Sequence, residues 1–395
     1  MNTEELRKER IQLFKDAIQM GKKPQRIPYF GNIWSWKIID AGYKLSEALY
    51  DYEVTEKVLR HVFENYKIDV LSETGWRNPV QVTSVMGNDE YIINDTANSI
   101  SIKDQCFMEA DEYDELIDNP KKFLWEKVVP RKYRLLREEE NNSGHFREFL
   151  QKYGEFGGFM GKVSKVMNEE YGIPDFADSL AAFDYWGNGY ELLFNILRGI
   201  KGLSIDMRRD PEKVSAAIEA LDETFMAPRL ERGKKQPKGT NMDFCVDMNP
   251  VMLGHTILSP KQFERFYWPH LKRVSDFAES YDKVVYIFAE GESSRFYEFF
   301  QEFPKGHFAI HTEQDDIFEL KKRVPNIAVA GGMKSSLLGK GTPQECVDYA
   351  KKLIDELGAD GGYIFSENKM ISFEQDCKAE NLKAVSDFVS EYNPY

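Results

Sequence analysis

The chain has 395 residues, of which 42% are hydrophobic, and its formal net charge is -14 at pH 7. This excess of acidic residues argues against a nucleic-acid-binding surface, which needs clustered Lys and Arg. No apolar run approaches the roughly twenty residues that a membrane-spanning helix needs, and the N-terminus has no apolar signal region. We therefore expect a cytoplasmic protein with neither nucleic-acid nor membrane partners.

Short runs of β-branched and aromatic residues recur along the chain, and helix-like patterns follow most of them. They predict strands at 27–33, 68–73, 180–185, 244–248, 284–289, 307–311, 327–331 and 362–365. Parallel strands need crossover helices, and eight of them can close a sheet without an exposed edge. The pattern therefore predicts an α/β fold, a (β/α)8 or TIM barrel.

Two segments lie outside this alternation. Residues 1–25 are charged and helix-periodic, which predicts an N-terminal helix. Residues 79–177 follow the second strand as an insertion, with a β-hairpin expected around Gly87-Asn88-Asp89 and charged helices expected over 111–150. We therefore expect a single barrel domain over 1–395 whose insertion roofs the active-site face.

The C-terminal ends of the predicted strands carry the candidate site, because chemistry in such barrels occurs there. Aromatic and polar residues gather at these ends, as a pocket for a flat, largely apolar ligand requires. The tryptophans among them could equally belong to the core under the insertion. The candidate substrate-binding residues are Asn32, Trp34, Trp36, Glu73, Trp76, Arg77, Tyr185, Trp186, Asp247, Phe288, Lys334 and Ser366.

Glu290 and His311 follow neighbouring predicted strands, so their side chains could reach each other or share a metal. A histidine with carboxylates suits zinc binding and general acid–base catalysis equally well. A purely structural pair, hydrogen-bonded at the barrel rim, is an equally good interpretation of Glu290 and His311. The sequence contains no dinucleotide-binding glycine motif, phosphate-binding loop, HExxH or serine-hydrolase elbow. Nucleotide-dependent and serine-hydrolase functions are therefore disfavoured.

Four motifs resemble those of a known family. They are Asp111-Glu-Tyr-Asp-Glu-Leu-Ile-Asp-Asn-Pro120, Leu258-Ser-Pro-Lys-Gln-Phe263 with Trp268-Pro269, Gly332 to Pro343, and Gly361-Gly-Tyr-Ile364 with Glu380-Asn-Leu382. On these motifs the chain, over residues 25–392, resembles the uroporphyrinogen decarboxylase superfamily. That superfamily unites tetrapyrrole decarboxylases and corrinoid-dependent methyltransferases on a (β/α)8 barrel.

Departures from the family patterns narrow the expected chemistry. Decarboxylases share an arginine-rich segment that holds the substrate's carboxylates, and Gly31-Asn-Ile-Trp-Ser-Trp-Lys37 stands in its place. Thiol and methanol methyltransferases bind zinc through His-x-Cys and a later cysteine, where this chain has Phe288-Ala-Glu290 and Ser366. The O-demethylase methyltransferases have Glu, 14 residues, Glu, 20 residues, His. Glu290 and His311 match the second half of that spacing, and Ser275 occupies the first position.

The resemblance therefore implies a methyltransferase that moves a methyl group from a methoxylated, aromatic small molecule to a corrinoid on a partner protein. Glu290 and His311 would bind a metal such as zinc, with Glu313 or Asp247 as a third ligand, or would act directly as an acid on the leaving oxygen. Two alternatives stay open, a decarboxylase or other lyase acting on a tetrapyrrole-like acid, and a non-catalytic corrinoid- or tetrapyrrole-binding protein. The oligomeric state is also open, with a homodimer as one candidate.

Overall fold

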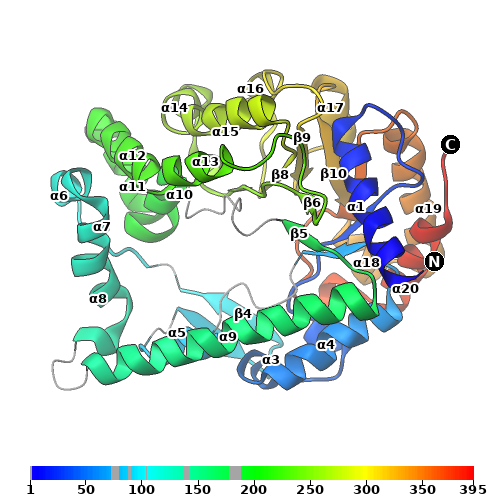
Figure 1. Ribbon diagram of the computed structural model, residues 1–395, viewed down its shortest axis with the longest axis horizontal. Helices are drawn as coiled ribbons and strands as arrows, with labels where there is room; N and C mark the ends of the chain where they lie inside the picture. The colour runs from blue at the N-terminus through cyan, green and yellow to red at the C-terminus, as the bar shows by residue number, and fades with distance from the viewer. Residues whose placement is uncertain (1, 73–79, 88–89, 104, 138–141, 178–187) are drawn as a thin grey trace.

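The computed structural model describes residues 2–72, 80–87, 90–103, 105–137, 142–177 and 188–395 (Figure 1). The strands are β1 (Tyr29–Gly31), β2 (Val70–Leu71), β3 (Tyr91–Asn94), β4 (Ser99–Ile102), β5 (Asp175–Ala177), β6 (Phe244–Val246), β7 (Val251–Met252), β8 (Val285–Ala289), β9 (Phe308–Thr312), β10 (Ala328–Met333) and β11 (Tyr363–Glu367).

The α-helices connect and cover these strands. They are α1 (Thr3–Gln19), α2 (Trp36–Asp40), α3 (Leu45–Tyr50), α4 (Tyr52–Asn65), α5 (Val80–Ser84), α6 (Tyr113–Asp118), α7 (Pro120–Phe123), α8 (Val129–Lys132), α9 (Asn142–Glu170), α10 (Gly189–Leu192), α11 (Gly199–Arg209), α12 (Pro211–Phe225), α13 (Ala227–Gly233), α14 (Pro260–Phe266), α15 (Trp268–Tyr281), α16 (Tyr297–Phe300), α17 (Ile317–Arg323), α18 (Ser335–Lys340), α19 (Pro343–Leu353) and α20 (Ala379–Glu391).

Parallel pairing joins the strands into a curled sheet in the order β2-β1-β11-β10-β9-β8-β7. A second parallel pair, β5 with β6, completes the circuit, because β5 contacts β2 and a bridge from Met248 to Val285 links the segment after β6 to β8. Taking β6 and β7 as one interrupted strand, the described residues supply eight parallel positions. The predicted α/β barrel fold is therefore confirmed.

The third predicted strand is not tested by the described residues. The strand at that position is β5, at Asp175–Ala177, and it pairs with β6. The predicted range 180–185 lies outside the described residues. The other predicted ranges overlap β1, β2, β6, β8, β9, β10 and β11.

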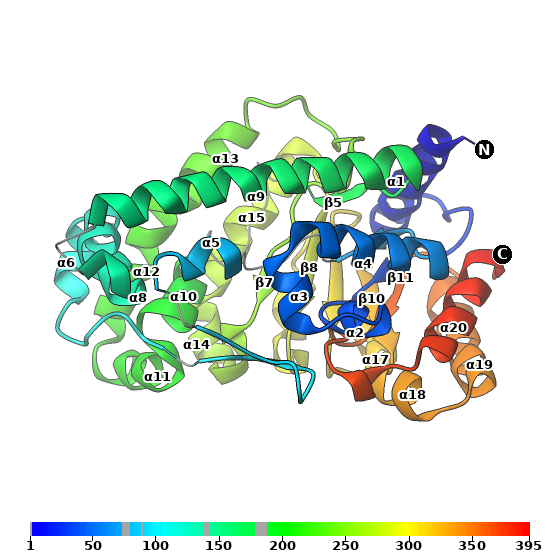
Figure 2. The same cartoon turned by 90° about the horizontal axis from the view of Figure 1, so that it is seen from below.

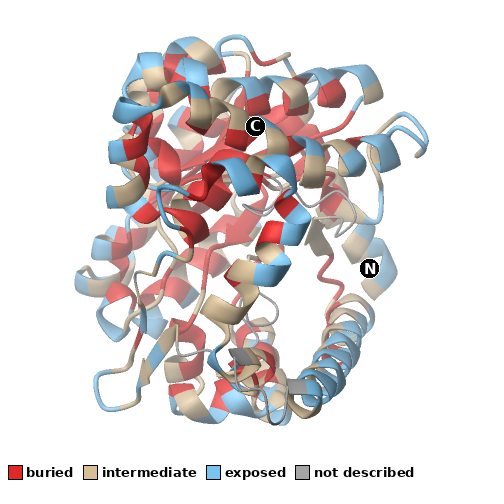
Figure 3. Ribbon diagram, turned by 90° about the vertical axis from the view of Figure 1, so that its left-hand side faces the viewer, coloured by how far each residue is buried: buried red, intermediate tan, exposed pale blue. Residues whose placement is uncertain are grey.

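Helix α1 covers the end of the barrel where the strands begin, and it lies within the predicted N-terminal helix. Its buried residues Ile11, Phe14 and Ile18 pack in one cluster with the inward-facing residues of the strands, among them Ala309 and Ala328. Small alanines on β9 and β10 leave room inside the barrel for these larger side chains. In Figure 3 the buried positions concentrate in the strands and in the helix faces turned toward them.

The segment between β2 and β5 contains the predicted hairpin and helices, with one correction. The hairpin is β3 with β4, and its turn lies at residues 95–98, whereas 80–84 form α5. The Asn94 side chain accepts hydrogen bonds from the backbone N–H groups of Thr96 and Ala97, and Asn98 adopts a positive φ of 46°. These local bonds place the turn here rather than at Gly87.

The helical part of that segment ends in α9, which has 29 residues. Figures 1 and 2 show this helix running along one side of the molecule, from α8 to the neighbourhood of α1. That the whole 79–177 segment acts as a roof over the barrel stays a prediction. No helix in the described part of the chain is long and apolar enough to cross a membrane.

Candidate active site

The inner face of the barrel continues toward the C-terminal ends of the strands, a region we call the mouth. Phe30, Tyr286, Ala309 and Ile364 belong to the inner core cluster. Side chains on a strand alternate between its two faces, so residues two positions further along lie on the same inner face and nearer the mouth. These residues are Asn32, Phe288, His311 and Ser366, all four predicted from the sequence.

His311 is fully buried on β9, and both of its ring nitrogens are engaged. Its Nε2 lies 2.8 Å from the backbone carbonyl oxygen of Glu367, and its Nδ1 lies 2.7 Å from the Tyr286 hydroxyl. A carbonyl can only accept, so Nε2 carries the proton and Nδ1 accepts from Tyr286. Burial lowers the pKa of His311 to about 4, and the ring is therefore neutral at pH 7.

Gly331 on β10 allows this placement of the His311 ring. A Cβ at this position would lie 2.9 Å from His311 Cδ2, and the backbone φ is +102°, where L side chains are strained. The absence of a side chain at Gly331 therefore allows the His311 ring to occupy its observed position. Any larger residue would displace the imidazole.

Aromatic rings form the floor of the mouth. The ring centroids of Phe288 and His311 lie 4.8 Å apart, and those of Phe30 and Tyr286 lie 5.1 Å apart. Phe176 of β5 joins them, at 4.5 Å from Phe30 and 5.0 Å from Tyr286. Phe30 and Tyr286 are buried in the core, whereas Phe288 and Phe176 are half-buried, so flat apolar surface for a ligand comes from the latter two.

Two polar side chains at the mouth are buried without a hydrogen-bond partner among the described residues. They are Asn32, whose Nδ2 is the unpaired atom, and Ser366, whose unpaired atom is Oγ. Their exposed fractions are 2% and 0%. Buried polar atoms in proteins are nearly always hydrogen-bonded, so these two groups are candidates to bond a ligand.

Glu367 holds the strand ends beside the mouth together. Its carboxylate accepts a hydrogen bond from the Tyr29 hydroxyl and another from the backbone N–H of Asn32, at 2.7 Å. Burial raises the pKa of this carboxyl, even though both hydrogen bonds favour its charged form. Glu367 therefore fixes the backbone that carries Asn32.

The carboxylates predicted to act with His311 lie nearer to solvent. Glu290 is exposed directly after β8, and its backbone N–H donates to the carbonyl of Met252 at 3.0 Å. Glu313 is half-buried, and its Oε2 accepts from the backbone N–H of Gly291 at 2.6 Å. Because both His311 ring nitrogens form hydrogen bonds, neither can coordinate a metal ion in this arrangement.

The described residues therefore do not fit the predicted zinc centre. Among them, no group of three or more His, Cys, Asp or Glu side chains is placed to hold a metal ion. Zinc at Glu290, His311 and Glu313 stays an untested prediction, and we derive no chemical step from it.

Three other predicted substrate-binding residues lie away from the mouth. Trp36 is buried, and its Nε1 donates to the carbonyl of Cys377 at 2.9 Å. Trp34 packs against the apolar cluster formed by α2, α3, α4, α5 and β4. Asp247 lies at the opposite end of the barrel, where its Oδ2 is 3.6 Å from Lys15 Nζ of α1 and accepts from the Val284 N–H.

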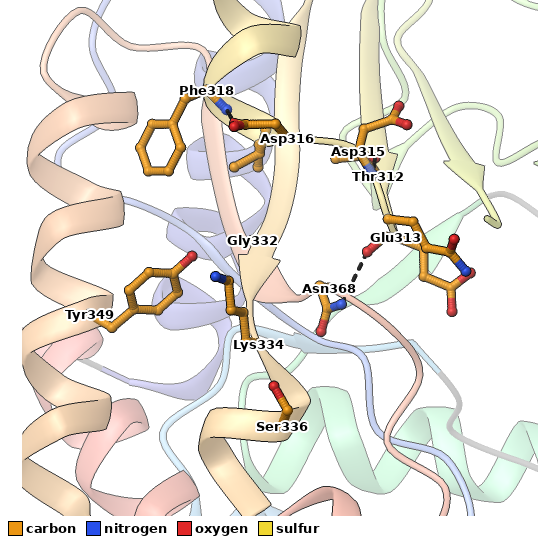
Figure 4. A pocket seen from close by; sticks show the side chains of 12 residues that line it. Thr312, Glu313, Asp315, Asp316, Phe318, Gly332, Lys334, Ser336, Tyr349 and Asn368 are labelled. Carbon is orange, nitrogen blue, oxygen red and sulfur yellow. Dashed lines mark hydrogen bonds between the residues drawn. The ribbon is translucent and has the colours of Figure 1, made fainter. Parts of the chain in front are cut away.

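Lys334, at the end of β10, lines a groove beside the mouth together with Glu313, Asp316, Tyr349 and Asn368 (Figure 4). The Asn368 amide ties two sides of this groove together, since it donates to the Glu313 carbonyl and accepts from the Ser335 N–H. The remaining predicted residues lie outside the described part of the chain. They are Glu73, Trp76, Arg77, Tyr185 and Trp186.

The sequence-based prediction omitted Tyr286, the partner of His311. Tyr286 lies on the same face of β8 as Phe288, and Glu290, directly after the strand, continues this spacing of two residues. That alternation was the available signal, since it places all three toward the barrel interior. The hydrogen bond itself joins residues 25 positions apart.

The model of one protein family, uroporphyrinogen decarboxylase (URO-D), matches residues 192–392. Among solved structures, a methyltransferase from Methanosarcina mazei is similar, with a TM-score of 0.61, 13% sequence identity and coverage of 98% of each chain. At that identity the likeness shows a shared fold alone. No curated protein matches the chain.

Proposed function

Because the chain belongs to the uroporphyrinogen decarboxylase family, we propose that it is a methyltransferase that moves a methyl group from a methoxylated aromatic compound to a corrinoid on a partner protein. The observation that carries this proposal is the composition of the mouth. Aromatic rings form its floor, and the buried polar atoms of Asn32 and Ser366 have no hydrogen-bond partner among the described residues. Such a site suits an uncharged ether group attached to a ring.

The transfer breaks the bond between the methyl carbon and the ether oxygen and forms a bond between that carbon and cobalt. The reduced cobalt of the acceptor supplies the electron pair, and the departing oxygen takes a proton. An unprotonated alkoxide or phenoxide leaves poorly, so the enzyme's contribution is to donate that proton and to orient the ether.

Glu290 is the candidate proton donor. It follows β8 at the mouth, and its side chain is exposed there, within reach of a ligand or a docked partner protein. His311 is neutral and its N–H is committed to Glu367, so we assign it a positioning role. In this assignment His311 holds Phe288 and the end of β11 in place around the ether.

A decarboxylase acting on a tetrapyrrole-like acid would need cations around its substrate. Arg26, one candidate for that role, lies at the opposite end of the barrel and pairs with Asp69 through two hydrogen bonds of 2.6 and 2.7 Å. Arg77 lies outside the described residues. Lys334, the third candidate, lines the groove beside the mouth. The position of Arg26 favours the methyltransferase, whereas that of Lys334 does not distinguish the two functions.

The test is a demethylation assay with a panel of phenyl methyl ethers and a reduced corrinoid protein, followed by the absorbance of methyl-cobalt. We expect methyl transfer only when the corrinoid protein is present. Glu290→Gln should lower kcat by about 10²- to 10⁴-fold, as expected for removal of a general acid. The matched control is Glu298→Gln, an exposed position on α16.

A panel that gives no methyl-cobalt signal contradicts the proposal. Tight binding of free cobalamin without turnover would instead support the non-catalytic alternative, and turnover of porphyrinogens would support the decarboxylase. Metal analysis of the purified protein tests the zinc prediction separately.

A further inference from the structure

The groove beside the mouth has a volume of about 480 Å³. Its walls come from the turn after β9, the start of α17, the turn after β10, and α19 (Figure 4). It lies at the same C-terminal edge of the sheet as the mouth, because Thr312 follows His311 on β9 and Asn368 follows Glu367, the last residue of β11. Ile317, Phe318 and Tyr349 belong to α17 and α19, so the groove lies on the helix side of these strand ends.

Lys334 supplies the positive charge of this groove. Its side chain is exposed, and within the described residues its ammonium has no ion pair and no hydrogen bond. The ammonium nitrogen lies 5.3 Å from the centre of the Tyr349 ring, and Figure 4 shows the two side chains directed toward each other. Lys334 is therefore held in the groove by a cation–π contact and has its charge available.

Three carboxylates also line the groove, and each is already engaged. Glu313 accepts from the Gly291 N–H, and Asp315 accepts from both the N–H and the hydroxyl of Ser293, at 2.8 and 2.6 Å. Asp316 caps α17 by accepting from the N–H groups of Phe318 and Glu319. These bonds satisfy the carboxylates but leave their charge in place, so an anion in the groove would have to lie against the wall that carries Lys334 and Tyr349.

Donors and apolar rings remain on the other wall. Within the described residues, the hydroxyls of Ser336 and Tyr349 have no hydrogen-bond partner. Burial raises the pKa of Tyr349, so its hydroxyl stays a donor. The rings of Phe318 and Tyr349 give the same wall flat apolar surface. An ammonium, two hydroxyl donors and aromatic faces suit a carboxylate attached to an aromatic ring.

We propose that this groove binds the carboxylate of a small aromatic acid, with Lys334 as the principal charge partner and the Ser336 and Tyr349 hydroxyls as donors. The identification of that acid with the methyl donor rests on the proposed function. In that case the enzyme selects methoxylated aromatic acids over neutral methoxylated compounds.

Calorimetric titration of the whole protein with para-methoxybenzoate and with para-methoxybenzyl alcohol tests the groove without any corrinoid protein. We expect the acid to bind more tightly than the alcohol. Lys334→Gln should weaken binding of the acid about tenfold and leave the alcohol unchanged, as expected for loss of one charge-assisted contact. Lys340→Gln removes the same charge from an exposed position of α18 outside the groove and is the matched control.

Equal binding of the acid to the wild type and Lys334→Gln, at the same unfolding temperature, overturns the groove proposal. So does a loss of equal size in Lys340→Gln, which would indicate a general charge effect. The two proposals fail separately. If binding of the acid depends on Lys334 but no methyl ether is demethylated, the groove proposal stands and the methyltransferase proposal is contradicted. If the wild type and Lys334→Gln demethylate acids and alcohols with equal kcat/KM, the methyltransferase proposal stands and the groove proposal is contradicted.

Discussion

At the end of the barrel where the strands begin, Asp69 is buried among partners: Arg26 donates two hydrogen bonds to it, Arg10 lies 3.3 Å away and the Tyr29 N–H donates at 2.8 Å. At the mouth, Ser366 is equally buried, yet its hydroxyl has no partner in the part of the chain that the structure describes. Arg10 Nε and Lys15 Nζ at the first end also lack a hydrogen bond within the described residues, but both lie in ion pairs, with Asp69 and Asp247. The Ser366 hydroxyl has neither kind of partner there.

The two ends of the barrel differ in what their buried polar groups do: at one end they stabilise the fold, and at the mouth they are available to bind a ligand. A buried charge is tolerated only when it is paired, and Arg10 of α1 and Arg26 of the segment before β1 both pair with Asp69 at this end. A buried polar atom without a partner lowers stability, and proteins keep such atoms where a ligand supplies the missing bond. We call the end of the barrel that α1 covers the closed end. Substitutions there should mainly lower the free energy of unfolding, whereas substitutions at the mouth should mainly weaken ligand binding.

The largest effect is expected for Asp69→Ala. Burial alone would raise the pKa of this carboxyl, but the charge and hydrogen bonds of Arg26 hold it below its usual range. Removal leaves two largely buried guanidinium groups without their shared partner, and we expect a loss of about 3–5 kcal/mol in the free energy of unfolding. Denaturant unfolding measures it.

The matched control is Glu169→Ala on α9. Glu169 and Lys165 form an ion pair of 3.9 Å whose side chains are 65% and 71% exposed. Its loss should change stability by less than about 0.5 kcal/mol. If the two variants unfold at the same denaturant concentration, the ion pairs of Asp69 with Arg10 and Arg26 do not stabilise this end of the barrel.

A smaller effect is expected from the ionisation of His311. Its pKa is about 4 in the folded protein, against an ordinary value of 6.5. As pH falls, the unfolded chain takes up this proton first, so stability present at pH 7 is lost as pH falls through 6.5 toward 4. We expect this residue to account for about 2 kcal/mol of the loss between pH 7 and pH 5.

Unfolding free energies of the wild type and His311→Gln at both pH values check this expectation. The variant should be less stable at pH 7 and less sensitive to acid. His255, whose pKa burial lowers to about 3, should account for part of the sensitivity that remains. An unchanged pH dependence in His311→Gln would show that the mouth admits enough water to charge the ring.

The barrel itself was predictable because strand periodicity and helix caps are local. Thr342 caps α19 through Glu345, and Ser259 caps α14 through Gln262, both within four residues. The hairpin turn was misplaced because two turn-forming segments compete in that stretch. The side-chain bonds of Asn94, which no composition rule ranks above Gly87, decide between them.

The strand-end rule found four inner-face residues of the mouth and failed for Asp247. Its strand is interrupted after Val246 and continues as β7 at Val251–Met252. The C-terminal end of the strand therefore lies five or six residues after Val246. The stagger of barrel strands, which brings Asp247 beside Val284 and Lys15, depends on pairing between distant segments. The tautomer of His311 depends on distant partners in the same way.

The smallest stability effect, and the one that tests the comparison most directly, comes from two wholly buried serines. Ser366→Ala removes a hydroxyl that has no partner in the described residues, so it should leave stability unchanged or raise it by up to about 1 kcal/mol. Ser386 on α20 donates to the Lys383 carbonyl at 3.0 Å, and Ser386→Ala should cost about 0.5–1.5 kcal/mol.

Opposite signs for the two serines, measured by denaturant unfolding, would show that the Ser366 hydroxyl is kept for a ligand. Binding of a phenyl methyl ether should then weaken in Ser366→Ala and remain unchanged in Ser386→Ala, because only the first serine faces the mouth. A loss of stability in Ser366→Ala equal to that in Ser386→Ala would mean that its hydroxyl is satisfied within the folded chain. The mouth would then resemble the closed end, and the ligand would have to be sought in the groove at Lys334.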